Sequence, residues 1–249
     1  MNLAPEADES LDVLSRTLRI LQRRRGHRAA SDDVVLAGVA VGAHPSPSRI
    51  LDLGTGKGTV ALLLLRRIPE AVAVGLEVYP ESHALAVRNA ALNGLDQRFS
   101  PQLADLREAD ALSGEGAFDL ITGAPPFMPV GTGVLPTDPQ RAAGRFELRG
   151  GIEDYALTAA RALAPQGRVV LLMDGANEAR TRSAFAAAGL ALHARVGVSP
   201  RPGRPEVYWV FVGGLEPGLD ALTLWSMRGA AGEAWSPEYA ALRRHLDLP

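Results

Sequence analysis

The feature that most constrains the fold is a glycine-rich run, Leu51-Asp52-Leu53-Gly54-Thr55-Gly56-Lys57-Gly58, which belongs to a strongly patterned stretch of the chain. Residues 49–53 are apolar in the manner of a buried strand, and residues 59–67 are typical of a helix. Glycine lets the backbone turn tightly and leaves space for a ligand against the main chain. The amides at the start of the following helix then face that ligand. The run therefore predicts a strand, a ligand-binding loop and a helix in succession.

The same alternation continues through the rest of the chain. The expected strands cover residues 49–53, 71–76, 98–104, 118–122, 167–173, 190–198 and 206–212. The expected helices cover residues 59–67, 80–93, 152–163 and 176–188. Strands that alternate with helices predict an α/β fold with a doubly wound, mostly parallel sheet of seven strands. The last two strands, joined by the proline-rich loop at residues 199–205, are expected to form an antiparallel pair, so that the last strand is antiparallel.

The N-terminal part of the chain is predicted to be a helical cap on this fold. Apolar residues between Ser10 and Arg24 recur at roughly helical spacing. Ser31-Asp32-Asp33 offers N-cap residues for a second helix over residues 34–41. Two prolines, Pro45 and Pro47, then interrupt the pattern. We therefore divide the chain into a helical cap segment, residues 1–44, and a catalytic domain, residues 45–249.

Composition excludes several classes of function. With 249 residues, 47% of them hydrophobic, the chain fits one α/β domain, alone or with a small appendage. The absence of cysteine excludes disulfides, thiolate metal sites and cysteine nucleophiles. A net charge of −2 implies no attraction of the whole molecule to nucleic acid, so any such binding must use local patches.

The sequence also carries no signal for a membrane or a metal ion. No apolar run reaches the roughly 18 residues of a membrane helix, and the acidic N-terminus does not resemble a signal peptide. His27 and His83 have no ligand partners at metal-binding spacing. We expect a cytoplasmic protein that binds neither membrane nor metal, and of the possible oligomeric states we favour a monomer.

The spacing of the glycines indicates which ligand the loop binds. A nicotinamide dinucleotide site requires G-x-G-x-x-G/A, which would place its third glycine at Thr59. The chain has G-x-G-x-G instead, preceded by Asp52. A carboxylate is unfavourable beside a pyrophosphate, whereas the cationic methionine portion of S-adenosylmethionine tolerates one. Both points favour S-adenosylmethionine over a dinucleotide or an empty glycine turn, with these predicted cofactor-binding residues: Asp52, Gly54, Thr55, Gly56 and Gly58.

Two acidic residues after later strands are further cofactor candidates. Glu77 follows the second strand, where a carboxylate can accept hydrogen bonds from both ribose hydroxyls. Dinucleotide sites use the same arrangement, so Glu77 does not separate the two cofactors. Asp105 follows the third strand and could accept a hydrogen bond from the adenine amino group. The alternative for each is an ordinary carboxylate at a strand end or in a loop.

A second loop, Gly123-Ala124-Pro125-Pro126-Phe127, follows the strand at residues 118–122. At this position the sequence resembles class I methyltransferases that act on planar amino groups and carry Asp/Asn/Ser-Pro-Pro-Tyr/Phe/Trp. The resemblance implies that a proline carbonyl accepts a hydrogen bond from the target amine and that the aromatic ring stacks on a flipped base. Extrusion exposes the target atom, and stacking is worth ~1–3 kcal/mol. The implied catalytic residues are Ala124, Pro125, Pro126 and Phe127.

Smaller matches extend the resemblance to bacterial tRNA(valine) adenine-N6 methyltransferases. They are Arg25-Gly26-His27-Arg28, Asp32-Asp33-Val34-Val35-Leu36, Pro129-x-Gly131-Thr132-Gly133, Arg141-x-x-x-Arg145-x-Glu147, Arg201-Pro202-Gly203-Arg204-Pro205 and Trp235-Ser236-Pro237-Glu238-Tyr239. The resemblance thus runs from about residue 11 to the end. It implies a Rossmann-like fold, S-adenosylmethionine as cofactor, and methylation of adenine N6 in tRNA near the anticodon.

One departure from the family leaves three functions open. Ala124 stands where the family has asparagine, so the side-chain acceptor for the target amine is missing. A lost hydrogen bond of this kind costs on the order of 1–3 kcal/mol. The three open functions are a slow RNA adenine methyltransferase, a methyltransferase for a protein glutamine or a small molecule, and a module that binds S-adenosylmethionine or RNA without catalysis.

Local basic segments supply the predicted RNA contacts. Arg25 and Arg28 lie in the N-terminal basic stretch, and Arg201 and Arg204 lie in the proline-rich loop. Arginines in such patches can contact phosphates on a protein that is otherwise nearly neutral. The alternative is that both segments are simply solvated. We predict tRNA as the partner and these four arginines as substrate-binding residues.

Overall fold

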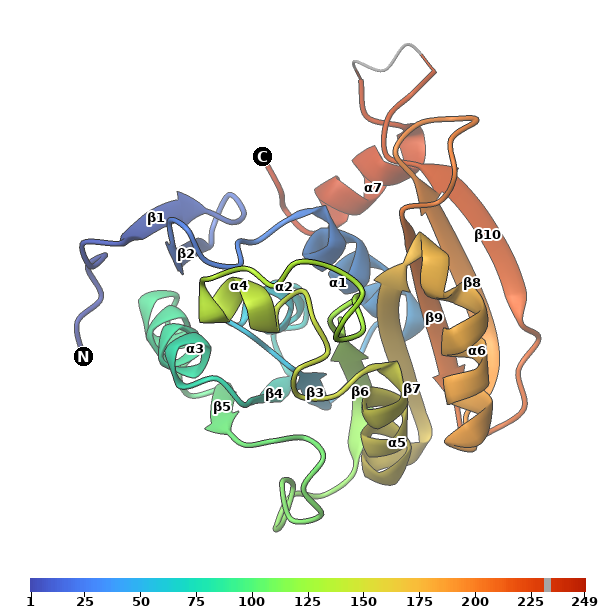
Figure 1. Cartoon of the computed structure of the whole chain (residues 1–249), viewed down its shortest axis with the longest axis horizontal. Coiled ribbons are helices and arrows are strands. Elements are labelled where there is room, and N and C mark those ends of the chain that lie inside the picture. The colour runs from blue at the N-terminus through green and yellow to red at the C-terminus, as the bar shows by residue number, and fades with distance from the viewer. Residues whose placement is uncertain (231–233) are drawn as a thin grey trace.

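The computed structural model describes residues 1–230 and 234–249 and contains one large sheet flanked by helices (Figure 1). The strands are β1 (Glu9–Val13), β2 (Arg19–Arg23), β3 (Arg49–Leu53), β4 (Val72–Glu77), β5 (Phe99–Leu103), β6 (Phe118–Gly123), β7 (Leu163–Asp174), β8 (Ala191–Ser199), β9 (Tyr208–Gly214) and β10 (Ala221–Ser226). The helices are α1 (Ser31–Ala43), α2 (Thr59–Arg67), α3 (Pro80–Leu92), α4 (Pro139–Ala143), α5 (Ile152–Ala162), α6 (Glu178–Ala187) and α7 (Pro237–His245). A short 3₁₀ turn, η1 (Gly175–Asn177), precedes α6.

The sheet has eight strands in the order β10-β8-β9-β7-β6-β3-β4-β5. Neighbouring strands are parallel except where β9 pairs antiparallel with β7 and with β8. The predicted doubly wound, mostly parallel sheet is therefore confirmed, including the antiparallel β8–β9 pair. The eighth strand, β10, was not predicted. It lies at the sheet edge, where Leu222 and Leu224 stay exposed, so the apolar pattern of a buried strand is absent.

Helices cover both faces of the sheet and divide the core into two apolar clusters. The first cluster joins the sheet to α1, α2, α3 and α7. The second joins the opposite face to α5 and α6. In β3, Ile50 points into the first cluster, whereas Leu51 and Leu53 point into the second. A strand buried on both faces is mostly apolar, which explains why Ile50, Leu51 and Leu53 of β3 are all apolar.

The topology brings three loops to one edge of the sheet. Strands β3, β6, β7 and β8 run in the same direction, so their carboxyl ends lie together. The glycine loop follows β3, the long loop containing α4 follows β6, and the loop at residues 200–207 follows β8. In open α/β sheets, ligands bind in the crevice outside the carboxyl ends of the strands.

The prediction of a helix over residues 10–24 is wrong, because these residues form the β1–β2 hairpin. The strands pair antiparallel with Leu11 opposite Leu21. The Ser15 hydroxyl accepts hydrogen bonds from the amides of Thr17 and Leu18 at 3.3 and 3.1 Å, and this favours a turn over a helix. Leu18 and Leu21 are buried while Leu11 is 45% exposed, so the apolar residues that suggested a helix are not all buried.

Buried asparagine side chains attach this hairpin to the sheet domain. The Asn89 side chain accepts a hydrogen bond from the Leu21 amide at 2.7 Å and donates one to the Leu21 carbonyl at 3.0 Å. Its amide also donates to the Lys57 carbonyl at 2.9 Å. Asn89 therefore links β2, α3 and the glycine loop, and it supplies the pairing that a third strand would otherwise provide.

The second predicted cap helix is present as α1, but it begins at Ser31 with Ala30 as its N-cap. The Ala30 amide donates to the Asp33 carboxylate at 3.0 Å, and this bond satisfies the first turn. Leu18 and Leu36 belong to the same apolar cluster as the sheet residues. The division of the chain at residue 45 stays a prediction. Within residues 1–230 and 234–249, none of the helices has the length and apolar character needed to span a bilayer.

Candidate active site

The glycine loop leaves β3 with a backbone that requires glycine. Gly54 and Gly56 have φ of +62° and +59°, in the left-handed region. A Cβ at Gly54 would collide with the hydroxyl of Tyr155, whereas a Cβ at Gly56 would meet no atom closer than 4.0 Å. The space in front of Gly56 is open, so a ligand can lie directly against the main chain there. Gly58 instead packs beneath the Phe99 ring as the N-cap of α2.

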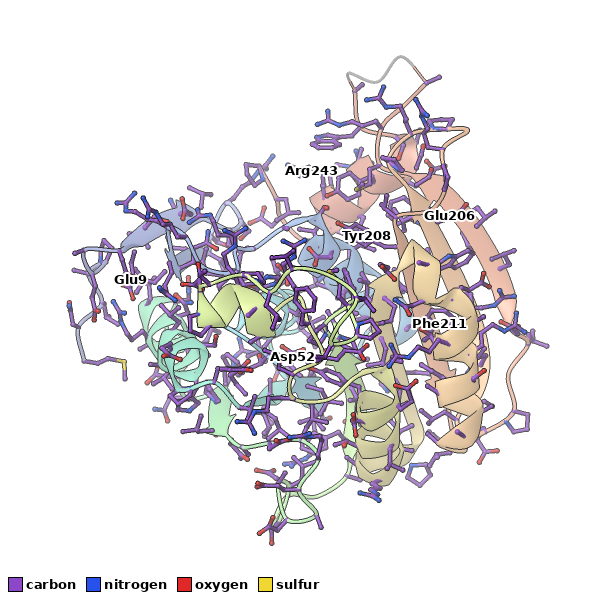
Figure 2. The ribbon with its side chains drawn as sticks, viewed as in Figure 1. Glu9, Asp52, Glu206, Tyr208, Phe211 and Arg243 are labelled. Atoms are coloured by element: carbon purple, nitrogen blue, oxygen red, sulfur yellow. The ribbon has the colours of Figure 1, made fainter. Side chains whose placement is uncertain are left out.

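Asp52 is buried near the end of β3, in the middle of the molecule (Figure 2). Its two carboxylate oxygens accept hydrogen bonds from Thr55 Oγ1 at 2.6 Å and from Thr122 Oγ1 at 2.7 Å. Burial raises the pKa of Asp52 to about 6 in spite of these bonds. The side chain thus fixes the glycine loop and the end of β6 to β3.

Glu77 and Asp105 line the smaller of two cavities at this edge of the sheet. The Glu77 carboxylate accepts hydrogen bonds from the Gly56 amide at 2.8 Å and the Tyr79 amide at 2.7 Å, and burial raises its pKa. Asp105 accepts a hydrogen bond from Arg107 Nη2 at 2.6 Å, and this pairing lowers the pKa of Asp105. Contacts of Glu77 with the ribose and of Asp105 with the adenine stay predictions.

The second loop lies where the smaller cavity meets a larger one. Ala124 lines both cavities, Pro126 lines the smaller, and Pro125 and Phe127 line the larger. The larger cavity measures about 550 Å³, within the range of ligand pockets. The loop is held by a hydrogen bond of 3.2 Å from Asn177 Nδ2 to the Phe127 carbonyl. Among the described residues, no hydrogen bond to the Pro125 carbonyl is formed.

The structure therefore brings together most of the predicted cofactor and target residues. Gly54 and Gly56 line both cavities. Asp52 and Thr55 line the larger cavity. Gly58 lines neither cavity. Its role in cofactor binding stays a prediction, and Gly58 could contribute only by shaping the loop.

The predicted RNA-binding arginines are more dispersed. Arg25 is exposed, whereas Arg28 lines the larger cavity and donates to Asp12 at 2.9 Å and to the Ser10 hydroxyl at 3.1 Å. Arg201 and Arg204 are exposed in the β8–β9 loop, at the same edge of the sheet, but they line neither cavity. Contact of these four side chains with RNA stays a prediction.

Sequence reasoning missed four residues of the site. Lys57 is buried between the two cavities, and this burial lowers its pKa. Asp32 and Asp33, from the first turn of α1, line the larger cavity, and Tyr155 from α5 lines the smaller. The available signal for Lys57 was that it is the only lysine of the chain and stands inside the glycine run.

The residues present fit S-adenosylmethionine. The open space at Gly56, with Glu77 beside it, suits a nucleoside with two hydroxyls. The larger cavity next to it contains carboxylates, among them a buried Asp32 oxygen with no hydrogen-bond partner, and these suit a cationic group. Among the residues that the structure describes, no cluster of three or more His, Asp or Glu side chains is arranged to hold a metal ion.

Comparison with known proteins identifies the domain. Residues 50–132, which include both loops, match the methyltransferase domain family. Over this segment the chain is similar to methyltransferase domains. S-adenosylmethionine is its cofactor, as predicted from the glycine loop.

Relatives of this methyltransferase domain act on different substrates. The tRNA1(Val) (adenine(37)-N6)-methyltransferase of Porphyromonas gingivalis is 34% identical over 145 residues, which cover 56% of this chain and 56% of that protein. A release factor glutamine methyltransferase of Rhodospirillum rubrum is 36% identical over 163 residues, which cover 61% of this chain and 47% of that protein. The chain thus spans about half the length of these relatives.

The fold of the methyltransferase domain agrees with solved structures. A predicted O-methyltransferase from Agrobacterium tumefaciens superposes with a TM-score of 0.66 at 19% identity, covering 88% of this chain and 98% of that protein. At this identity the likeness concerns the fold alone. It confirms the Rossmann-like arrangement of a central sheet with helices on both sides.

Proposed function

We propose that the protein is an S-adenosylmethionine-dependent N-methyltransferase that methylates N6 of an adenine in tRNA, near the anticodon. The observation that carries the proposal is the position of Ala124-Pro125-Pro126-Phe127 at the junction of the two cavities. A cofactor nucleoside held by Glu77 on one side would lie next to a target group held by this loop on the other.

The chain's own residues account for the chemistry that such a transfer needs. Bound S-adenosylmethionine supplies a methyl group activated by the sulfonium. The Pro125 carbonyl would accept a hydrogen bond from the target amine, which helps to localise the nitrogen lone pair, and the Phe127 ring would stack on the base. Methyl transfer needs no covalent intermediate, so positioning of the two reactants supplies most of the acceleration.

The charges around the larger cavity support a base with an amino group as the target. Asp33 and Asp174 line the cavity and can accept N–H groups. Exposed Arg141 and Arg145 lie at the same cavity and can contact phosphates outside it. This arrangement suits a nucleotide whose base enters and whose backbone stays at the surface.

A protein glutamine is the second candidate target. The side-chain amide of glutamine is planar and presents the same N–H groups to the Pro125 carbonyl. The relative from Rhodospirillum rubrum that is 36% identical is named as a release factor glutamine methyltransferase. A small molecule with a planar amino group belongs to the same alternative.

A third candidate is a protein that binds S-adenosylmethionine or RNA without catalysis. Its support is Ala124, which lines both cavities but offers no side-chain acceptor to a target amine. It differs from the other two candidates in predicting cofactor binding without transfer.

Transfer of a radiolabelled methyl group separates these candidates. The protein is incubated with labelled S-adenosylmethionine and either a set of unmodified tRNA transcripts or a protein extract that contains release factors. Unmodified transcripts are used because cellular tRNA can already carry the modification. We expect label in the transcripts. Label only in protein would establish a protein target, and cofactor binding without label in either pool would exclude both macromolecular targets and leave a small-molecule methyltransferase or the third candidate.

A further inference from the structure

Lys57 is a buried lysine at the junction of the two cavities. Its side chain is 6% exposed and lines both cavities. Within residues 1–230 and 234–249, no carboxylate oxygen lies within 4.0 Å of its ammonium group, and no hydrogen bond from that group is formed. A buried charge without a partner is costly. An anionic ligand group in either cavity could therefore pair with the ammonium group of Lys57.

Negative charge faces the same space from the first turn of α1. Asp32 and Asp33 both line the larger cavity together with Lys57. One Asp33 oxygen accepts the Ala30 amide, but Oδ1 of Asp32 is buried and has no hydrogen-bond partner. The charges of Asp33 and Asp32 act on Lys57 and oppose the lowering of its pKa by burial, yet neither carboxylate forms a salt bridge with it. A gap of more than 4.0 Å therefore separates the Lys57 nitrogen from the carboxylate oxygens of Asp32 and Asp33.

We propose that Lys57 and Asp32 hold the α-amino acid end of the cofactor across this gap. Lys57 pairs with the α-carboxylate and Asp32 accepts from the α-ammonium group. The proposal rests on the cofactor-binding part of the proposed function and not on the identity of the methylated substrate. A zwitterion supplies one full charge to each protein group, whereas a neutral base or amide would leave both buried charges without a counter-charge.

Asp32 is more available than Asp52 for this interaction. Each of its oxygens already accepts a hydroxyl hydrogen bond, one from Thr55 and one from Thr122. Asp52, which the sequence predicts beside the methionine portion, therefore already joins three segments of the fold. The acid contributed by α1 remains available.

Two ligands that differ only in the amino acid end test the proposal. S-adenosylhomocysteine carries the α-amino and α-carboxylate groups, and 5′-methylthioadenosine lacks both. Calorimetric titration gives the affinity of each ligand for the wild type, Lys57→Met and Asp32→Asn. We expect each substitution to weaken S-adenosylhomocysteine about ten- to a hundred-fold. The affinity for 5′-methylthioadenosine is expected to stay within about three-fold, which also shows that the variant is folded.

The controls remove the same charges elsewhere. Arg67→Met changes an exposed cation at the far end of α2, and Asp110→Asn changes an exposed loop carboxylate; neither is expected to alter either affinity. If Lys57→Met fails to fold, the nearly isosteric Asp32→Asn carries the test. Equal losses of affinity for the two ligands, or no loss for either, would overturn the proposal that Lys57 and Asp32 hold the amino acid end of the cofactor. Unchanged S-adenosylhomocysteine binding with a raised KM for tRNA would also overturn it, because the pair would then serve the target base.

The experiment distinguishes failure of this proposal for Lys57 and Asp32 from failure of the proposed function. Binding is measured without a methyl acceptor, so inactivity on tRNA does not affect the result. A wild type that binds neither ligand would refute the cofactor site itself, and with it the roles proposed for Lys57 and Asp32.

Discussion

Thr122 donates a hydrogen bond from its hydroxyl to Oδ1 of Asp52 at 2.7 Å and so joins the end of β6 to the end of β3. The other Asp52 oxygen accepts the Thr55 hydroxyl of the glycine loop at 2.6 Å. One carboxylate thus ties the strand before the cofactor loop to the strand before Ala124-Pro125-Pro126-Phe127. The relative position of the two loops depends on this buried junction.

Removal of the Thr122 hydroxyl is expected to destabilise the fold. Thr122→Val keeps the shape of the side chain but leaves a buried Asp52 oxygen without its donor. The free energy of unfolding should fall by about 1–3 kcal/mol, measured by urea denaturation. Thr137→Val, at an exposed position, is the matched control. A loss no larger than in the control would show that the junction does not stabilise the fold.

Ionisation of Asp52 should make stability depend on pH. Burial raises its pKa from 3.8 to about 6, so the folded state favours the protonated form. The stabilisation is fully present below pH 3.8 and is lost as the pH rises through about 6. The free energy of unfolding of the wild type relative to Asp52→Asn should therefore fall by about 3 kcal/mol across this window.

Urea denaturation of both proteins at a series of pH values measures this difference, because asparagine cannot ionise. Effects of other titrating groups are shared by the two proteins and cancel. Parallel stability profiles between pH 3.8 and 7 would contradict the assignment of a raised pKa to Asp52.

The central sheet could be predicted from sequence because its strands are buried on both faces. Most residues of β3 and β6 are apolar, and the glycines after β3 leave few alternatives for the backbone. The hairpin at Glu9–Val13 and Arg19–Arg23 could not be predicted, because the Asn89 side chain, distant in sequence, pairs with its backbone. The edge strand β10 and the helix α7 likewise depend on tertiary packing.

The candidate site was only partly predictable for a similar reason. The residues on the two loops follow directly from local motifs that precede or follow strands. Asp32 and Lys57 meet the same cavity because α1 packs beside the glycine loop, and this packing cannot be derived from the two local motifs that contain them. The position of a buried charge relative to a distant helix is set by the fold.

Restoration of a side-chain acceptor in the second loop should raise activity. Ala124→Asn places an amide oxygen at the junction of the two cavities, where it can accept the target amine alongside the Pro125 carbonyl. We expect kcat for methylation of tRNA to rise about ten- to a hundred-fold, with little change in S-adenosylhomocysteine affinity. Single-turnover methylation rates measure the effect. Lower activity in Ala124→Asn would show that the site is adapted to another target.

The arginines of the β8–β9 loop should contribute to tRNA binding through phosphates. Replacement of Arg201 and Arg204 by alanine is expected to weaken binding and to reduce the slope of log Kd against log salt by about 2, one for each lost contact. Filter binding over a potassium chloride series measures the slope. The double variant Arg67→Ala/Arg161→Ala removes two exposed arginines from the opposite edge and serves as the control. Equal slopes for the two double variants would contradict an RNA contact at this loop.

The methylated atom is the most direct test of the proposed function. Unmodified tRNA transcripts are incubated with the protein and S-adenosylmethionine, digested to nucleosides and analysed by mass spectrometry, with fragment mapping to locate the site. The proposed function predicts N6-methyladenosine at a single position near the anticodon. Transcripts that carry no N6-methyladenosine, from a protein that binds S-adenosylhomocysteine normally, would contradict it.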